Sequence, residues 1–126
     1  MLATQLDAYR TTQKTTITGR ELEASVLTQA ALRLTACQTN WDAIDRDARL
    51  EEALTHNQRI WTIFQSELAK DDNPLPRQTK EDLLSLSLFI DKRTFDIMAY
   101  PDPAKLTMLI NINLNIAAGL RGLAGV

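Results

Sequence analysis

Apolar residues recur at helical spacing between residues 47 and 70, and this pattern constrains the fold more than any other. At about 100° per residue they fall on one stripe of a helix, which needs a packing partner. The stripe consists of Leu50, Ala53, Leu54, Ile60, Trp61, Phe64 and Leu68. Only 4 Gly and 4 Pro interrupt the 126 residues, too few for a protein of turns and short strands. The sequence therefore predicts a helical protein.

Two helices are expected before this segment. The first covers residues 2–13 and is followed by a Thr-rich linker, residues 11–18, which is poor in helix formers. The second begins at Thr18, which has the spacing of a capping box with Glu21. Its expected inward stripe is Leu22, Val26, Ala30, Leu34 and Cys37.

Proline pairs mark the boundaries of the last two helices. Pro74 and Pro76 lack the N–H that a helix interior needs, so they belong to a connection, and a helix of residues 79–100 follows. Asp102 is a good N-cap, and Pro103 suits the first position of the next helix.

The segment 110–116 is ambiguous because apolar residues and Asn alternate strictly, which is the period of a strand. We interpret it as helix, because it follows an Asp-Pro start and a lone strand has nothing to pair with. The expected fold is all-α, a compact bundle of four to five helices in a single domain of residues 1–126. Whether the helix of residues 2–13 forms a separate arm is left open.

Charge and composition narrow the function classes. The net charge is -2 and the pI about 5.3, whereas nucleic-acid-binding proteins usually have a basic surplus, so direct nucleic acid binding is not expected. No stretch approaches the roughly 20 apolar residues of a membrane span, and the first twenty residues lack the apolar run of a signal peptide. The single cysteine, Cys37, indicates a reducing compartment. We expect a cytoplasmic protein without membrane insertion.

No catalytic or metal-binding motif is present. His56 is the only histidine and Cys37 the only cysteine, which excludes zinc sites built from two or more His. The two residues form a nucleophile pair only if the fold brings them together. A buried thiol and a surface imidazole are the simpler interpretation. The sequence therefore predicts a protein that is not an enzyme and that needs no cofactor.

Two asparagines interrupt apolar stripes. Asn57 lies between Leu54 and Trp61, and Asn113 lies in the middle of the apolar face of the last helix. A buried Asn costs a few kcal/mol unless its amide is paired. Either one or both face solvent on an open side of the bundle, or they fix helix register or bond each other, as buried Asn does in coiled coils.

The helix of residues 79–100 carries apolar residues on more than one face, so it is either the centre of the bundle or offers a second face to a partner. The first helix has an apolar stripe of its own. The candidate partner-binding residues are Leu84, Leu88 and Phe95 on the second face, and Leu2, Leu6 and Tyr9 on the first helix. In the alternative interpretation, the first helix covers this face and closes the core.

Short motifs in several places resemble the FlaF family of flagellar biosynthesis proteins. The run 53–61, which contains Asn57 and Trp61, is similar to that family's Ala-Leu, Asn, Trp signature. The run 109–113, which ends at Asn113, and the later Gly119-Leu120 resemble its C-terminal Ile-Asn and Gly-Leu element.

The resemblance implies a factor that promotes flagellin production and secretion, as a chaperone that binds flagellin before export. It also implies a second partner, an FlbT-like regulator that acts on flagellin messenger RNA. In the alternative interpretation, the chain is an adaptor that binds this regulator without chaperoning flagellin.

Overall fold

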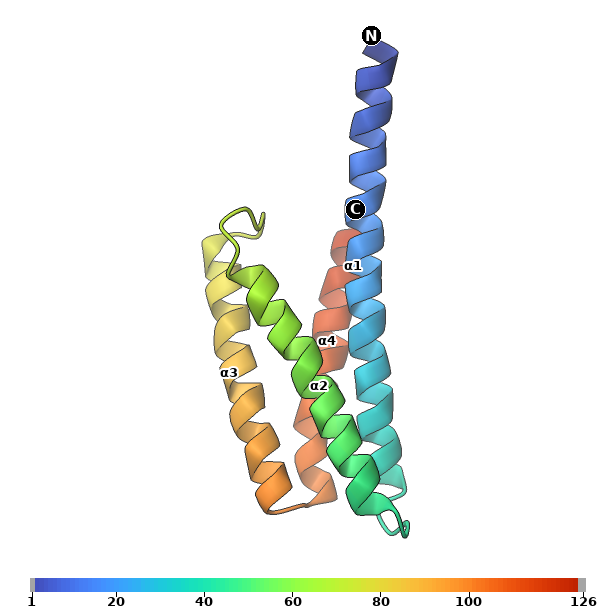
Figure 1. The fold of residues 1–126 in the computed structure, drawn as a ribbon, viewed down its shortest axis with the longest axis vertical. Helices are drawn as coiled ribbons and strands as arrows, with labels where there is room; N and C mark the ends of the chain where they lie inside the picture. Colours follow the sequence, from blue (N-terminus) through green and yellow to red (C-terminus); the bar gives the residue numbers. More distant parts are fainter. Residues whose placement is uncertain (1, 125–126) are drawn as a thin grey trace.

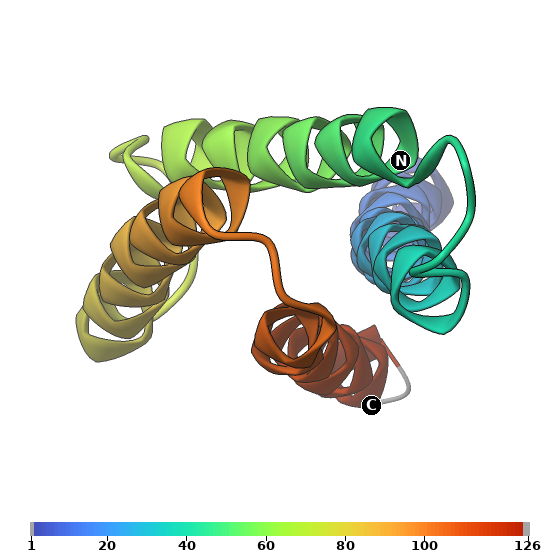
Figure 2. The ribbon, with the colours of Figure 1, turned by 90° about the horizontal axis from the view of Figure 1, so that it is seen from below.

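The computed structural model describes the backbone of residues 2–124 and the side chains of residues 19–122. The elements follow in the order α1 (Leu2–Thr39), α2 (Arg46–Leu68), α3 (Arg77–Ala99), a 3-10 turn η1 (Pro103–Lys105) and α4 (Leu106–Ala124). Successive helices run in opposite directions (Figure 1), and end-on they follow one another around a ring (Figure 2). The described residues contain no strand, so the predicted all-α bundle is confirmed.

The Thr-rich linker expected at residues 11–18 is wrong as a helix break, because α1 runs without interruption from Leu2 to Thr39. The two helices expected there are one, and no helix begins at Thr18. A threonine in a helix costs at most about 0.7 kcal/mol, far less than the roughly 3 kcal/mol of a proline. Further along α1, the hydroxyls of Thr28 and Thr35 donate to the carbonyls of Ala24 and Ala31 at 2.9 and 2.8 Å.

Helices α1 and α4 form the most closely packed pair, and alanines make this possible. Ala24, Ala30, Ala31 and Ala117 are all buried, and their short side chains let the two backbones approach closely. The inward stripe expected for this part of α1 is wrong at Leu22, which is 64 % exposed. A helix has 3.6 residues per turn, so a stripe drawn at steps of four drifts around the helix.

The interpretation of residues 110–116 as helix is confirmed, since they lie within α4. Asn111 and Asn115 face solvent, as the helical wheel requires. The start is confirmed as well: the carboxylate of Asp102 accepts a hydrogen bond from the backbone N–H of Ala104 at 2.9 Å, and Pro103 occupies the first position of η1.

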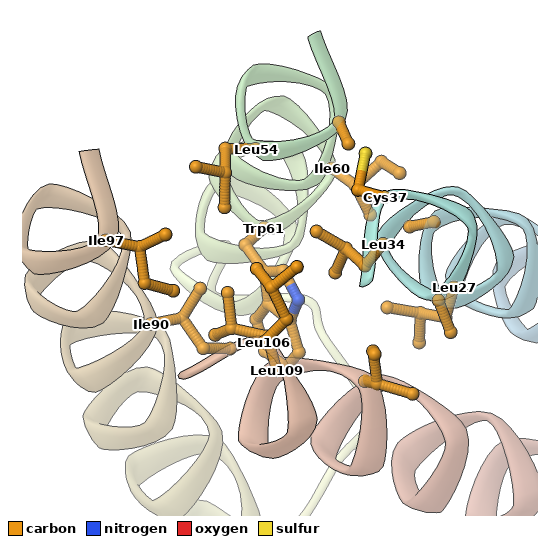
Figure 3. Close-up of a cluster of buried hydrophobic side chains, with 14 of the residues drawn as sticks. Leu27, Leu34, Cys37, Leu54, Ile60, Trp61, Ile90, Ile97, Leu106 and Leu109 are labelled. Atoms are coloured by element: carbon orange, nitrogen blue, oxygen red, sulfur yellow. The ribbon is translucent and has the colours of Figure 1, made fainter. Parts of the chain in front are cut away.

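The core lies where all four helices meet (Figure 3). The stripe predicted on α2 is confirmed: its members are buried, except for the partly buried Phe64. Around Trp61 of α2, side chains converge from α1, α3 and α4. They include Leu27, Leu34, Ile90, Ile97, Leu106 and Leu109. In the part of the chain that the structure describes, no helix combines the length and apolar character needed to cross a membrane.

Candidate partner-binding site

Asn57, Trp61 and Asn113 form one chain of hydrogen bonds in the core. The indole Nε1 of Trp61 donates to Oδ1 of Asn113 at 2.9 Å, and Nδ2 of Asn113 donates to Oδ1 of Asn57 at 2.6 Å. Both asparagines are 0 % exposed. The prediction that the two buried amides bond each other is confirmed, and it links α2 to α4.

The indole fixes the orientation of both amides. An indole N–H can only donate, so the atom of Asn113 that faces it must be the oxygen. The amide nitrogen of Asn113 then faces Asn57, and the atom it meets must again be an oxygen. This leaves Nδ2 of Asn57 buried and without a hydrogen-bond partner. The hydrogen bonds hold α2 and α4 at one register. The buried unpaired donor costs about 1–3 kcal/mol, and this cost lowers the stability of the fold.

Helix α3 exposes several large apolar residues, although it buries Ile90 and Ile97. Leu88 and Phe95 are 62 % and 65 % exposed, whereas the smaller and more polar Ser87 and Thr94 are fully buried. Thr94 satisfies its hydroxyl by donating to the carbonyl of Ile90 at 2.7 Å. The buried side of α3 therefore combines Ile90 and Ile97 with two small polar residues, and a second apolar stripe of this helix faces solvent.

The exposed apolar side of α3 follows helical spacing. Leu84 is partly buried, and Leu88, Phe95 and Met98 continue the same side along the helix. We call these four residues the α3 outer face. Helix α1 lies on the opposite side of the ring from α3 (Figure 2), so the alternative that the first helix covers this face is wrong. The side chains of Leu2, Leu6 and Tyr9 lie outside the described residues.

A family model described as flagellar protein FlaF matches residues 5–120 of the chain. The chain belongs to the FlaF family. It is therefore a flagellar protein. Comparisons with curated proteins and with solved structures give no significant match.

The motif residues that carry the FlaF resemblance occupy two different environments. Asn57, Trp61 and Asn113 form the buried hydrogen-bond chain, and they were the residues that the sequence singled out. Gly119 lies on the exposed side of α4 with a negative φ, and a Cβ built on it meets nothing within 4 Å. The fold of the described chain therefore does not need a glycine at this position.

The ionisable side chains of this FlaF-family chain form no metal site among residues 19–122, where no three His, Cys, Asp or Glu side chains gather closely enough to hold an ion. Burial raises the pKa of the Cys37 thiol, and the nearby Arg49 opposes this only in part. Burial, with Arg33 nearby, lowers the pKa of His56. A thiol with a raised pKa holds little thiolate, which is the nucleophilic form.

Proposed function

We propose that this chain binds flagellin before export and holds an amphipathic helix of flagellin on the α3 outer face. The terminal segments of flagellin are expected to be amphipathic helices that bury their apolar sides only in the filament. A chaperone for them has to offer a matching apolar surface that takes anchor residues at i, i+3 and i+4.

One observation carries the proposal: α3 presents Leu88 and Phe95 to solvent while it buries Ser87 and Thr94. Contiguous exposed apolar residues on a small protein usually mark an interaction surface. The four residues of the α3 outer face recur at the spacing with which one helix packs along another. Family membership supplies the flagellar context, and the resemblance suggests flagellin as the partner.

The proposed role is to bind and not to catalyse. The raised pKa of Cys37 argues against a thiolate nucleophile, and the lowered pKa of His56 argues against a charged imidazole near neutral pH. Both residues lie away from the α3 outer face in the sequence, on α1 and α2. This supports a protein whose only chemistry is the burial of apolar surface.

The test is a flagellin-binding measurement on Leu88→Glu and Phe95→Glu, by titration calorimetry with purified flagellin. Each change places a charge at an apolar contact, and we expect each to weaken binding at least about tenfold. Because both side chains are exposed, the free energy of unfolding should change by no more than about 0.5 kcal/mol. Far-UV circular dichroism and a thermal melt measure that directly.

Ile63→Glu is the matched control, because Ile63 on α2 is 62 % exposed, as Leu88 is. It should leave flagellin binding unchanged. If Leu88→Glu and Phe95→Glu bind flagellin normally, the α3 outer face is not the site. If the intact protein does not bind flagellin but binds the FlbT-like regulator, the adaptor function replaces the chaperone function.

A further inference from the structure

The α2–α3 hairpin diverges from the α1–α4 pair toward the end where α2 passes into α3 (Figure 1). An apolar groove with a volume of about 320 Å³ lies there. That volume is at the lower end of the range for ligand sites, about 300–1,000 Å³. The apolar lining comes from three helices and the 69–76 connection, and it includes Trp61, Phe64, Leu75, Leu83, Ile116 and Leu120. We call this the end groove.

The buried hydrogen bonds hold part of the wall of the end groove in a fixed position. Trp61 lines the groove, and its indole is held in place by the 2.9 Å bond to Asn113. Phe64 packs edge-on against Trp61, with ring centroids 5.8 Å apart. A surface whose side chains are already ordered loses little conformational entropy when it binds. The end groove is therefore a preformed binding surface.

The charged residues that line the end groove are already paired within the chain. Arg20 forms an ion pair with Glu23 at 3.1 Å, and Lys70 forms one with Glu67 at 2.8 Å. Arg20, Glu23 and Glu67 are lining residues. Among the described residues, Arg20 and Lys70 are therefore both paired with acids of the chain itself.

Acidic residues are in excess at the same end of the bundle. Residues 67–82 hold five acids and three bases, and Asp71 and Asp72 take part in no ion pair among the described residues. Asp71 and Asp72 lie in the connection that supplies Leu75 to the groove wall. Helices α2 and α4 end here with partial negative charge and α3 begins here with partial positive charge, so the negative excess comes mainly from the side chains. The mouth of the end groove therefore favours a positively charged ligand.

We propose that the end groove binds an amphipathic helix of a partner protein that carries Lys or Arg beside its apolar stripe. The apolar anchors of that helix fill the space between Phe64, Leu75 and Leu120, and its basic side chains meet Asp71 and Asp72. The groove is separate from the α3 outer face, so this inference does not depend on flagellin binding.

The test uses two labelled helical peptides with the same leucine stripe, one flanked by Lys and the other by Glu, and measures fluorescence anisotropy with the intact chain. The Lys peptide should bind at least about tenfold more tightly. Its affinity should fall as the ionic strength rises from about 0.05 M to about 0.5 M, because screening weakens exposed charge pairs. Equal affinity for the two peptides would overturn the proposal.

Variants then locate the site. Leu75→Gln and Leu120→Gln remove apolar wall without changing charge, and each should weaken the Lys peptide about tenfold. The double change Asp71→Lys with Asp72→Lys should reverse the preference between the peptides. Leu88→Glu on the α3 outer face is the control and should leave Lys-peptide binding intact. If both wall variants bind the Lys peptide as tightly as the wild type, the proposal is overturned. It is also overturned if the chain forms a dimer that Leu75→Gln dissociates and that the peptide does not displace, because the groove then binds a second copy of the chain.

Discussion

The buried hydrogen-bond chain makes an asymmetric prediction about two similar substitutions. Asn113 accepts from Trp61 and donates to Asn57, so Asn113→Leu leaves two buried groups without partners: the indole N–H and the Oδ1 of Asn57. At about 1–3 kcal/mol for each group, the free energy of unfolding should fall by roughly 2–6 kcal/mol. The added apolar burial of the leucine offsets a part of this loss.

Asn57→Leu should cost far less. It orphans one donor, Nδ2 of Asn113, but it also removes Nδ2 of Asn57, which has no partner in the native protein. The two changes nearly cancel, and we expect a net effect within about 1 kcal/mol. The double variant leaves only the Trp61 N–H unpaired, so it should be more stable than Asn113→Leu alone.

Urea unfolding followed by far-UV circular dichroism measures all four members of this cycle under conditions where one transition is seen. The reasoning is refuted if Asn57→Leu costs as much as Asn113→Leu. It is also refuted if the double variant loses the sum of the two single losses, because groups in one network have to couple.

Three further predictions concern single positions. Gly119→Ala should raise the free energy of unfolding by about 0.5–1 kcal/mol, because alanine favours the helix more than glycine and its Cβ meets no other atom here. An unchanged or lower melting temperature contradicts this. Cys37 should react with a thiol reagent much more slowly in the folded chain than in urea, because it is buried and burial raises its pKa; equal rates would show an open thiol. Burial lowers the pKa of His56, so the unfolded chain binds the proton more readily, and stability should fall as the pH drops below about 6.5 and level off below the folded-state pKa. His56→Gln should remove that part of the pH dependence measured by urea titration.

Helix positions and the asparagine pair could be predicted from the sequence because both depend on periodicity. A polar residue inside an apolar stripe is either exposed or paired, and the structure decides for pairing at Asn57 and Asn113. The helix break predicted at residues 11–18 was wrong, because low helix propensity is a weak signal in a segment without proline. The predicted burial of Leu22 was wrong, because positions four residues apart drift around a helix that has 3.6 residues per turn.

The orientation of α3 and the end groove were harder to predict. Ser87, Ile90, Thr94 and Ile97 do follow helical spacing, and that signal marks the buried side. Leu84, Leu88 and Phe95 form a competing apolar stripe, so periodicity alone does not decide which side is buried. The end groove depends on the angle at which two helix pairs diverge, and that angle is set by packing between distant side chains.

The packing of α1 against α4 joins segments that are far apart in the sequence, and it therefore cannot form until α4 has been synthesised. Ala31 and Ala117 are more than eighty residues apart, so a ribosome adding about 5–20 residues per second needs roughly 4–17 s between them. During that interval the apolar stripe of α1 lacks the helix against which it packs most closely. Pairings between distant segments also slow folding after release. A nascent chain that stops before α4 keeps this stripe exposed and becomes a target for aggregation and degradation.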